Sequence, residues 1–299
     1  MIPATFQQYA ARGPDWASWL DRVPGLVREL FEEWSLTPDG AATHGFTALV
    51  LPVRTAAGRP AVLKVGWPHP EAEHEALALQ HWHGDGAVRL LRADPHRWAL
   101  LLERLHREDL SQRWDREACE VVARLYGRLH VPAPPQLRCL SEQAARWAEE
   151  LGALGRDAPL PHRMVEHARA LARDFAADPA TDGVLIHADL HFGNVLAGDR
   201  EEWLAIDPKP LSGDPHYELA PMLWNRFEEY AGRERDAIRD RFLTLVDSAE
   251  LDEDRARDWV IVRMLDLAME RLEDPPGTGR QIPTGDWLTM CVTIAKAVQ

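Results

Sequence analysis

One segment in the second half of the chain constrains the fold more than any other, because it places strands among residues whose pattern is otherwise helical. It consists of VLIHADLHFGN (184–194) and, nine residues later, WLAIDPKP (203–210). An apolar run that ends in polar residues predicts a buried strand, and this one delivers Asp189 to a loop. The next two short strands predict a hairpin that brings Asn194 beside Asp207.

The spacing of these three side chains predicts phosphoryl-transfer chemistry. Two neighbouring oxygen-bearing side chains, Asn194 and Asp207, suit Mg²⁺, which takes few protein ligands and completes its shell with water and phosphate oxygens. Asp189 is then placed to accept or orient the proton of an attacking hydroxyl group. The order resembles the kinase pattern H-R-D-x-x-x-x-N followed by the Asp of D-F-G. Ala188 replaces the Arg of that pattern, so control by an activation-loop phosphate is not expected.

The first hundred residues are rich in predicted strands. FTALVLPVR (46–54) and PAVLKVGW (60–67) flank a turn-like TAAGR and predict a hairpin. Residues 70–82 begin with Pro and acidic residues and have apolar positions three and four apart, which predicts a helix. Two further strands are expected at 87–91 and 98–105.

Beyond that point the apolar spacing is mostly helical, and the chain is expected to form a small β-rich lobe followed by a larger helical lobe. A Pro-containing stretch, 130–139, is expected to connect two of the helices. The predicted helices lie near residues 115–130, 141–154, 161–177, 233–248, 253–273 and 284–298.

Composition narrows the class of protein. A chain of 299 residues with 45% hydrophobic residues can bury a large core. A formal charge of −14 disfavours nucleic-acid binding and suits a cationic small substrate. Three widely separated cysteines predict no disulfide framework. No apolar run reaches 18 residues and no secretion signal is evident, so no membrane association and a cytoplasmic location are expected.

The segment HADLHFGN (187–194) resembles the H-G-D-L-H-x-G-N element of the aminoglycoside phosphotransferase-like kinases. Two longer runs, 206–226 and 63–79, are similar to the streptomycin 6-phosphotransferase and hydroxyurea phosphotransferase branch of that family. The resemblance extends from about residue 40 to the last helices. It implies an α+β, two-lobed protein-kinase-like fold, the cofactors ATP and Mg²⁺, and a small-molecule acceptor with a hydroxyl group.

The same resemblance divides the chain into an N-terminal lobe, 1–103, and a C-terminal lobe, 104–299. In the first lobe, Lys64 lies in the middle of an apolar strand, where an ammonium group without a partner would be costly. Glu75 on the following helix is the expected carboxylate partner, with Glu71 or Glu73 as alternatives. A Lys–Glu pair of this kind resembles the one that holds the α- and β-phosphates of ATP.

Weaker signals predict the rest of the nucleotide site. DGAATHGFTALV (39–50) is not a G-x-G-x-x-G motif, but its place before Lys64 suggests that backbone amides near Thr43 contact phosphate. The strand that ends in LLLERLHRED (100–109) is expected to form the hinge, where the main chain of Glu103 and Leu105 would contact adenine.

Two further groups of charged residues are singled out. Glu218 stands where the family usually has Asp, and a buried hydrogen-bonding role is expected for it. Arg263, Asp266 and Glu270 follow one stripe of an apolar helix. The stripe predicts a place for a cationic acceptor, although a solvated helix face explains the same pattern.

These observations predict an ATP-dependent O-phosphotransferase that modifies an antibiotic, with streptomycin as the expected acceptor. A metabolic kinase acting on an amino alcohol or a sugar is the alternative within enzymes. A nucleotide-binding pseudokinase is the alternative from another class. It is disfavoured because Lys64, Asp189, Asn194 and Asp207 are all present.

Overall fold

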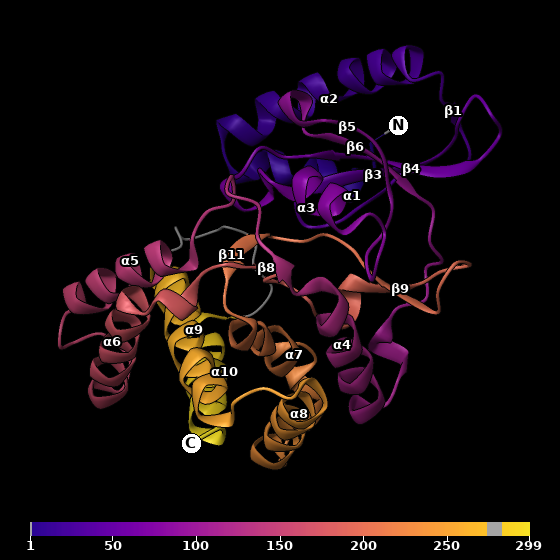
Figure 1. The fold of residues 1–299 in the computed structure, drawn as a ribbon. Helices are drawn as coiled ribbons and strands as arrows, with labels where there is room; N and C mark the ends of the chain where they lie inside the picture. Colours follow the sequence, from indigo (N-terminus) through magenta and orange to yellow (C-terminus); the bar gives the residue numbers. More distant parts are fainter. Residues whose placement is uncertain (1, 274–282) are drawn as a thin grey trace. The chain divides into compact units, whose positions relative to one another are not determined.

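The computed structural model describes residues 2–273 and 283–299 and divides into two compact units (Figure 1). The first unit contains the residues up to Arg107 together with 197–204. The second contains the other described residues. The first unit is built around an antiparallel sheet and the second is mostly helical, so the predicted α+β class is confirmed.

The sheet of the first unit has the order β1-β3-β4-β6-β5, with β2 paired to β3. The predicted hairpin is confirmed, since β3 and β4 pair antiparallel from Ala48↔Gly66 to Arg54↔Pro60. The strand expected at 87–91 begins three residues late, because Gly84 and Gly86 have positive φ angles and prolong the turn before it. The six strands are β1 (Thr37–Pro38), β2 (Thr43–His44), β3 (Ala48–Arg54), β4 (Pro60–Gly66), β5 (Leu90–Asp94) and β6 (Ala99–Glu103).

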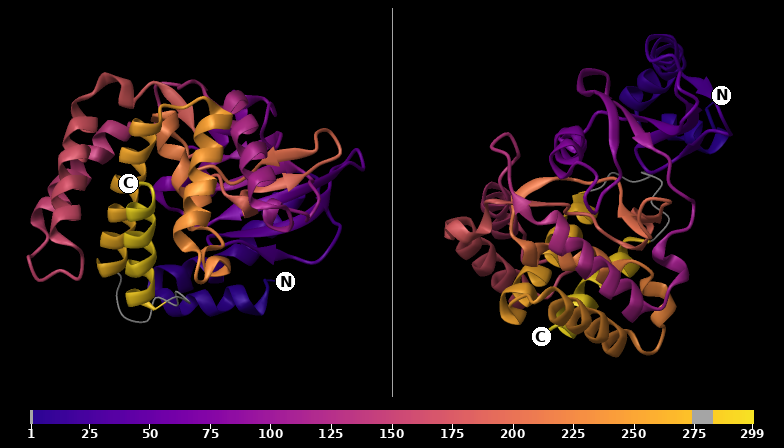
Figure 2. Two further views of the ribbon diagram at one scale, coloured as in Figure 1. Left: turned by 90° about the horizontal axis from the view of Figure 1, so that it is seen from below. Right: turned by 45° about the vertical axis from the view of Figure 1, so that its right-hand side comes forward.

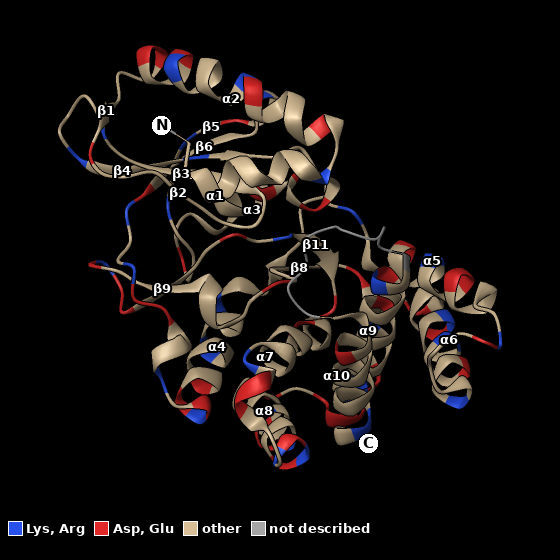
Figure 3. Cartoon of the chain, turned by 180° about the vertical axis from the view of Figure 1, so that it is seen from behind, with Lys and Arg blue, Asp and Glu red and all other residues tan. Residues whose placement is uncertain are grey.

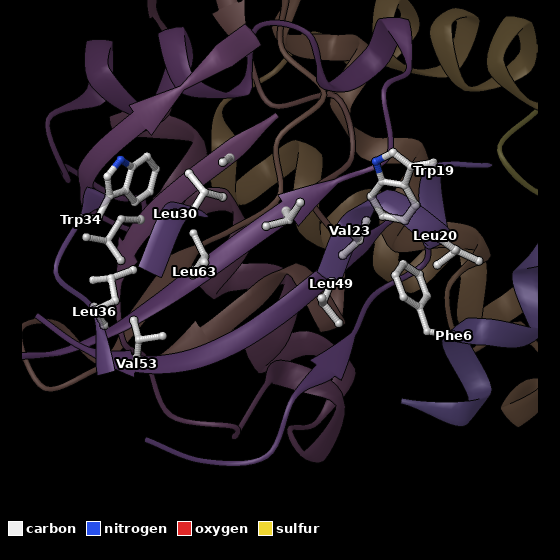
Figure 4. Close-up of a cluster of buried hydrophobic side chains, with 14 residues drawn as sticks. Phe6, Trp19, Leu20, Val23, Leu30, Trp34, Leu36, Leu49, Val53 and Leu63 are labelled. Atoms are coloured by element: carbon white, nitrogen blue, oxygen red, sulfur yellow. The ribbon is translucent and has the colours of Figure 1, made fainter. Parts of the chain in front are cut away.

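Apolar and charged side chains of β4 lie on opposite faces of the sheet. Leu63 and Val65 are fully buried and pack in the cluster that α2 (Pro14–Glu33) covers (Figure 4). Successive side chains of a strand point to opposite faces, so Lys64 points away from that cluster. Its ammonium group binds Glu75 of α3 (Glu75–Trp82) on the other face. The helix predicted over 70–82 begins at Glu75 in the structure and follows a 3₁₀ turn.

The 20-residue helix α2 was not predicted from the sequence. Its buried positions Trp19, Leu20, Val23 and Leu30 have helical spacing, so the signal was present. Pro24 lies inside this helix. A proline at that place argued against a helix, because proline removes one backbone hydrogen bond and usually ends a helix. The burial of the apolar face against the sheet compensates for that loss. Two shorter elements precede α2, namely α1 (Ala4–Gln7) and the 3₁₀ helix η1 (Gln8–Arg12).

The second unit contains all six helices that the apolar spacing predicts in this half, each within about two residues of its expected bounds. Its short strands form the sheet β11-β8-β7. The separate pair β9-β10 spans the boundary, since residues 197–204 belong to the first unit. The helices are α4 (Asp115–Leu129), α5 (Leu140–Ala153), α6 (His162–Ala177), α7 (Ala220–Trp224), α8 (Glu234–Ala249), α9 (Glu253–Glu273) and α10 (Thr284–Ala297). The strands are β7 (Val131–Pro132), β8 (Val184–Ile186), β9 (Val195–Ala197), β10 (Trp203–Ala205) and β11 (Leu211–Gly213).

Aromatic packing fixes the helices of the second unit around the short sheet. The rings of Phe175 on α6 and Trp259 on α9 stack with centroids 3.7 Å apart. The indole N–H of Trp259 donates to the buried carboxylate of Asp214 at 2.6 Å. Both views of Figure 2 show α9 and α10 packed side by side. Because α9 contacts both α6 and the segment after β11, it forms a rigid support for the strands that carry the site.

Charged residues of both signs are interspersed along α2, α6 and α8 (Figure 3). Within residues 2–273 and 283–299, no helix is long and apolar enough to cross a membrane.

Cys119 and Cys291 are buried and Cys139 is partly buried, and all three are free thiols, as the sequence predicts.

Candidate active site

The buried ion pair of the first unit joins Lys64 on β4 to Glu75 on α3. The ammonium Nζ lies 2.6 Å from Oε1 and 2.7 Å from Oε2 of the carboxylate. The side chains are 13% and 6% exposed. Glu71 and Glu73, the alternative partners, are exposed to solvent. The geometry therefore brings together the two residues that the sequence predicted as a pair, with the ammonium held in a fixed place.

The predicted phosphate-contacting segment forms the β2–β3 hairpin, in which Thr43 pairs with Val50. At its tip, the N–H of Gly45 donates to the carbonyl of Ala48 at 2.9 Å and is used within the turn. The amides of Phe46 and Thr47 donate to no acceptor within the part of the chain that the structure describes. Adjacent outward amides are a common anion-binding arrangement, so the tip has the donors that a phosphate needs.

The expected hinge follows β6. The N–H of Glu103 donates to the carbonyl of Arg89 at 3.0 Å, so adenine contact by Glu103 would have to use its carbonyl oxygen. Its carboxylate accepts from the Arg200 guanidinium at 2.8 Å, which ties the tip of the β9–β10 hairpin to the first unit. Among the described residues, neither main-chain group of Leu105 has a hydrogen-bond partner. Leu105 is thus the better supported of the two predicted adenine contacts.

The predicted catalytic loop begins directly after β8, and buried His187 fixes its start. The Nε2 of His187 lies 2.9 Å from the carbonyl oxygen of Ile206, and its Nδ1 accepts from the N–H of Asp189 at 3.3 Å. Burial lowers the pKa of His187 to about 4, so the ring is neutral near pH 7. A neutral ring with Nε2–H donating and Nδ1 accepting matches both contacts. His187 therefore binds backbone groups, as expected, and leaves the partly exposed Asp189 at the surface of the loop.

Ala188 has a left-handed backbone with φ +62°, although it stands where the resembling motif has Gly. Its N–H donates to the carboxylate of Glu218 at 2.5 Å, and its carbonyl accepts from the guanidinium of Arg263. A non-glycine residue in this conformation is strained and persists where its surroundings hold it. The two hydrogen bonds hold the peptide groups on either side of Ala188, and therefore the direction in which Asp189 leaves the loop.

Glu218 is fully buried, which confirms the hydrogen-bonding role expected for it. Its second carboxylate oxygen lies 2.8 Å from Nε2 of His130, and its carbonyl accepts from the hydroxyl of Tyr126 at 2.8 Å. Burial acts to raise the pKa of Glu218, but the hydrogen bond from His130, with the charges and the Ala188 amide nearby, outweighs burial and lowers it. Glu218 is thus ionised near pH 7, and its two oxygens contact the Ala188 amide and His130.

The predicted magnesium ligands lie at the base of the β9–β10 hairpin. The N–H of Ile206 donates to the carbonyl of Asn194 at 2.9 Å, which sets Asn194 beside the residue before Asp207. The Nδ2 of Asn194 donates to the carbonyl of Asp189 at 2.8 Å, so Oδ1 is the atom of this side chain that could bind a cation. Asp207 has φ +57° and a side chain 35% exposed. Asn194 is buried at 8% exposure, so Asp207 is the more accessible of the two oxygen-bearing side chains. Hard oxygen ligands of this kind fit Mg²⁺, which keeps several waters or phosphate oxygens.

Lys209 supplies a cation beside this pair of oxygens. Its ammonium lies 3.2 Å from Oδ2 of Asp207, and its N–H donates to the carbonyl of His187 at 2.9 Å. Sequence reasoning missed this contact. The signal was the basic residue two positions after Asp207, inside the quoted IDPKP run.

His191 binds a backbone amide at the start of the next 3₁₀ turn. Its Nδ1 accepts from the N–H of Gly193 at 3.1 Å and caps the 3₁₀ turn Phe192–Asn194. Burial lowers the pKa of His191 to about 4. Across residues 2–273 and 283–299, no group of three or more His, Cys, Asp or Glu side chains is placed to hold a metal ion.

The polar stripe of α9 divides into two parts. Arg263 reaches the loop after β8, because its guanidinium donates to the carbonyl of Ala188. It also donates to the carbonyl of Tyr217 at 3.2 Å and lies over the rings of Tyr217 and Trp224. Asp266 is buried at 9% exposure, and Glu270 is exposed. Arg263 thus supports Ala188, and helical spacing alone did not predict that target.

Comparison with known proteins agrees with this geometry. The profile of the family described as aminoglycoside/hydroxyurea antibiotic resistance kinase matches residues 33–274. A hydroxyurea phosphotransferase of Kitasatospora aureofaciens is 43% identical over 282 residues, which cover 91% of this chain and 81% of the relative. A streptomycin 6-kinase of Streptomyces griseus is 41% identical over 271 residues, covering 88% and 87%.

Among solved structures, a choline/ethanolamine kinase family protein from Mesorhizobium loti has a TM-score of 0.65 at 15% identity. The match covers 91% of this chain and 94% of that protein, and it establishes the kinase-like fold. The chain belongs to the aminoglycoside/hydroxyurea antibiotic resistance kinase family. It is a phosphotransferase that takes a phosphoryl group from ATP and passes it to a hydroxyl group of a small molecule.

Proposed function

We propose that the acceptor is streptomycin or a closely related cationic aminoglycoside, and that Mg²⁺ accompanies ATP. The observation that carries the proposal is the pair of hydrogen bonds that joins Asn194 to the carbonyl of Asp189 and to the N–H of Ile206, the residue before Asp207. The similarity to a streptomycin 6-kinase, at 41% identity over 88% of this chain, supports the choice of acceptor.

Each residue of the second unit has a distinct part in the proposed transfer. The carboxylate of Asp189 orients the acceptor hydroxyl and takes its proton as the oxygen attacks the γ-phosphorus. The bond from that phosphorus to the bridging oxygen breaks, and ADP leaves. Asn194 and Asp207 hold Mg²⁺, which neutralises charge on the phosphates when it is bound. The Lys209 ammonium, 3.2 Å from Oδ2 of Asp207, offsets part of the charge of that carboxylate.

The first unit is proposed to hold the nucleotide. Lys64, fixed by Glu75, contacts the α- and β-phosphates. The amides beyond Thr43 at the hairpin tip cover the phosphates. The main chain of Leu105 and the carbonyl of Glu103 contact adenine.

The acceptor is proposed to carry positive charge. The formal charge of −14 raises the local concentration of a cationic substrate. Asp266 and Glu270 are proposed to contact its basic groups, since they lie on the same helix as Arg263, which reaches the catalytic loop.

Hydroxyurea is the second candidate acceptor, and one observation favours it. The hydroxyurea phosphotransferase has 43% identity over 91% of this chain. Hydroxyurea is small and uncharged, so a kinase specialised for it would not need acidic residues at the acceptor site.

The test is phosphorylation of a panel of acceptors by the purified protein with ATP and Mg²⁺, with the product identified by mass. The panel contains streptomycin, other aminoglycosides, hydroxyurea, an amino alcohol and a sugar, and Asp207→Ala is the inactive control. A phosphorylated streptomycin is expected. Transfer to hydroxyurea alone would select the second candidate. Nucleotide binding without transfer to any acceptor would indicate a pseudokinase and contradict both.

A further inference from the structure

An N-terminal segment of the first unit lies against the tip of the β2–β3 hairpin. The ring of Phe6 stacks on the ring of His44, with centroids 4.8 Å apart and an angle of 22° between the planes. The hydroxyl of Thr5 lies 2.8 Å from Nε2 of the same His44, whose Nδ1 lies 2.8 Å from the carbonyl oxygen of Gly45. His44 is therefore held on both sides of its ring and is tied to the turn itself.

Arg12 makes a second connection to the tip. Its guanidinium carbon lies 3.5 Å from the centroid of the Tyr9 ring and 4.4 Å from that of Phe46. One of its nitrogens donates to the carbonyl of Phe46 at 3.5 Å. A planar guanidinium between two aromatic faces gains from cation–π attraction. This contact gives Phe46 a packed neighbour, although 61% of its surface is exposed.

The segment that holds the tip is itself anchored in the core. Phe6 is fully buried and packs edge-on against Trp19 of α2 (Figure 4). Trp16 stacks on Trp67 with centroids 4.3 Å apart. The N–H of Trp67 in turn donates to the carbonyl of Thr47 at 2.7 Å, on the far side of the tip. The hairpin tip is thus held at both ends by groups that belong to one aromatic cluster.

We propose that Tyr9 and Arg12 are positioning residues for ATP, because they hold the outward amides of Phe46 and Thr47 in the arrangement that binds phosphate. This inference rests on the proposed function, in which the hairpin tip covers the phosphates. A hairpin tip that is free to move must be ordered when a ligand binds, and that ordering opposes binding. Contacts that order the tip beforehand remove this cost, so their loss weakens nucleotide binding without touching the acceptor.

The variants Arg12→Ala and Tyr9→Leu test the proposal in the full chain. We expect the dissociation constant of the ATP analogue AMP-PNP with Mg²⁺, measured by calorimetry, to rise about 5- to 20-fold in each. The KM for the acceptor and kcat at saturating ATP should stay within about twofold. Arg22→Ala is the matched control, since Arg22 is an exposed arginine of α2 that donates to the carbonyl of Ser18.

The double variant distinguishes positioning from direct contact. If both residues act through the hairpin tip, Arg12→Ala with Tyr9→Leu should weaken binding no more than either single change. Amide hydrogen exchange at Phe46 and Thr47 should also be faster in each variant without nucleotide. An effect of Arg12→Ala that Tyr9→Leu does not share would mean direct phosphate contact and overturn the proposal. Unchanged nucleotide affinity in both would do the same, whereas a wild-type protein that binds no ATP would refute the proposed function first.

Discussion

The amide of Ala188 donates to the buried carboxylate of Glu218 at 2.5 Å, in a loop where Ala188 itself has a left-handed backbone. A left-handed alanine costs roughly 1–2 kcal/mol. The hydrogen bonds of Glu218 and Arg263 hold the strained residue in place from two different segments of the second unit. The direction of the Asp189 side chain therefore depends on Glu218 and Arg263, which lie 29 and 74 residues after Asp189 in the sequence.

Replacing Ala188 with Gly should stabilise the protein, because glycine adopts φ +62° without a Cβ penalty. We expect a gain of about 1 kcal/mol in the free energy of unfolding, which is roughly 2–4 °C in Tm. Ala205→Gly is the control, because Ala205 is buried in the regular strand β10 and its loss should destabilise. Thermal melts that move in the same direction for both variants would show that Ala188 is not strained.

Buried His187 should make stability depend on pH. Its pKa of about 4 in the folded state is below the ordinary 6.5, so the unfolded chain binds a proton that the folded protein does not. Stability therefore falls as the pH drops from 6.5 towards 4, by up to about 1.4 kcal/mol per pH unit from this residue. Urea unfolding between pH 7 and 5 should show a shallower slope in His187→Gln. A slope equal to that of the wild type would contradict this assignment.

The Lys64–Glu75 pair should behave differently in single and double variants. Glu75→Gln removes the carboxylate from a nearly buried ammonium and is expected to cost about 3–5 kcal/mol. Lys64→Met combined with Glu75→Gln removes both charges and should recover most of that loss. ATP affinity should stay low in the double variant, because the phosphate-binding ammonium is gone. Denaturant unfolding and calorimetry report the two quantities separately, and recovery of ATP affinity would exclude Lys64 from the site.

Asp189→Asn should separate chemistry from nucleotide binding. The amide keeps the shape of the carboxylate but accepts no proton, so kcat should fall by roughly 10²- to 10⁴-fold. The affinity for AMP-PNP with Mg²⁺ should change little, since Asn194 and Asp207 are the proposed metal ligands. Asp199→Asn, on an exposed turn where the carboxylate pairs with His106, is the control in single-turnover kinetics. Weaker nucleotide binding in Asp189→Asn would instead assign Asp189 to the metal.

Neutralising the acidic stripe of α9 tests the proposed acceptor site. Asp266→Asn with Glu270→Gln should raise the KM for streptomycin and leave the KM for ATP nearly unchanged. The control is Glu253→Gln with Asp254→Asn, two carboxylates at the start of the same helix that pair with Arg257. Equal changes in both KM values, or no change in either, would remove the stripe from the site.

Local patterns predicted much of this molecule, and long-range contacts explain what they missed. The apolar spacing predicted the helices of the second unit. The pairing of Lys64 with Glu75 was predicted because a buried charge without a partner is costly. The helix α2 was missed because Pro24 outweighed a periodic apolar face that only the sheet completes. The partner of Arg263 was missed because helical spacing gives the face of a side chain but not the segment packed on it. The left-handed Ala188 was unpredictable from propensity, since tertiary hydrogen bonds maintain it.

The first unit is not continuous in sequence, because residues 197–204 belong to it together with the residues up to Arg107. The N–H of His106 donates to the carbonyl of Ala197, and Glu103 pairs with Arg200. A ribosome adds about 5–20 residues per second, so the missing piece emerges roughly 5–20 s after Arg107. During that interval Glu103 and His106, at and just after the end of β6, lack the contacts that Arg200 and Ala197 supply. A fragment that stops at Arg107 would never gain these contacts.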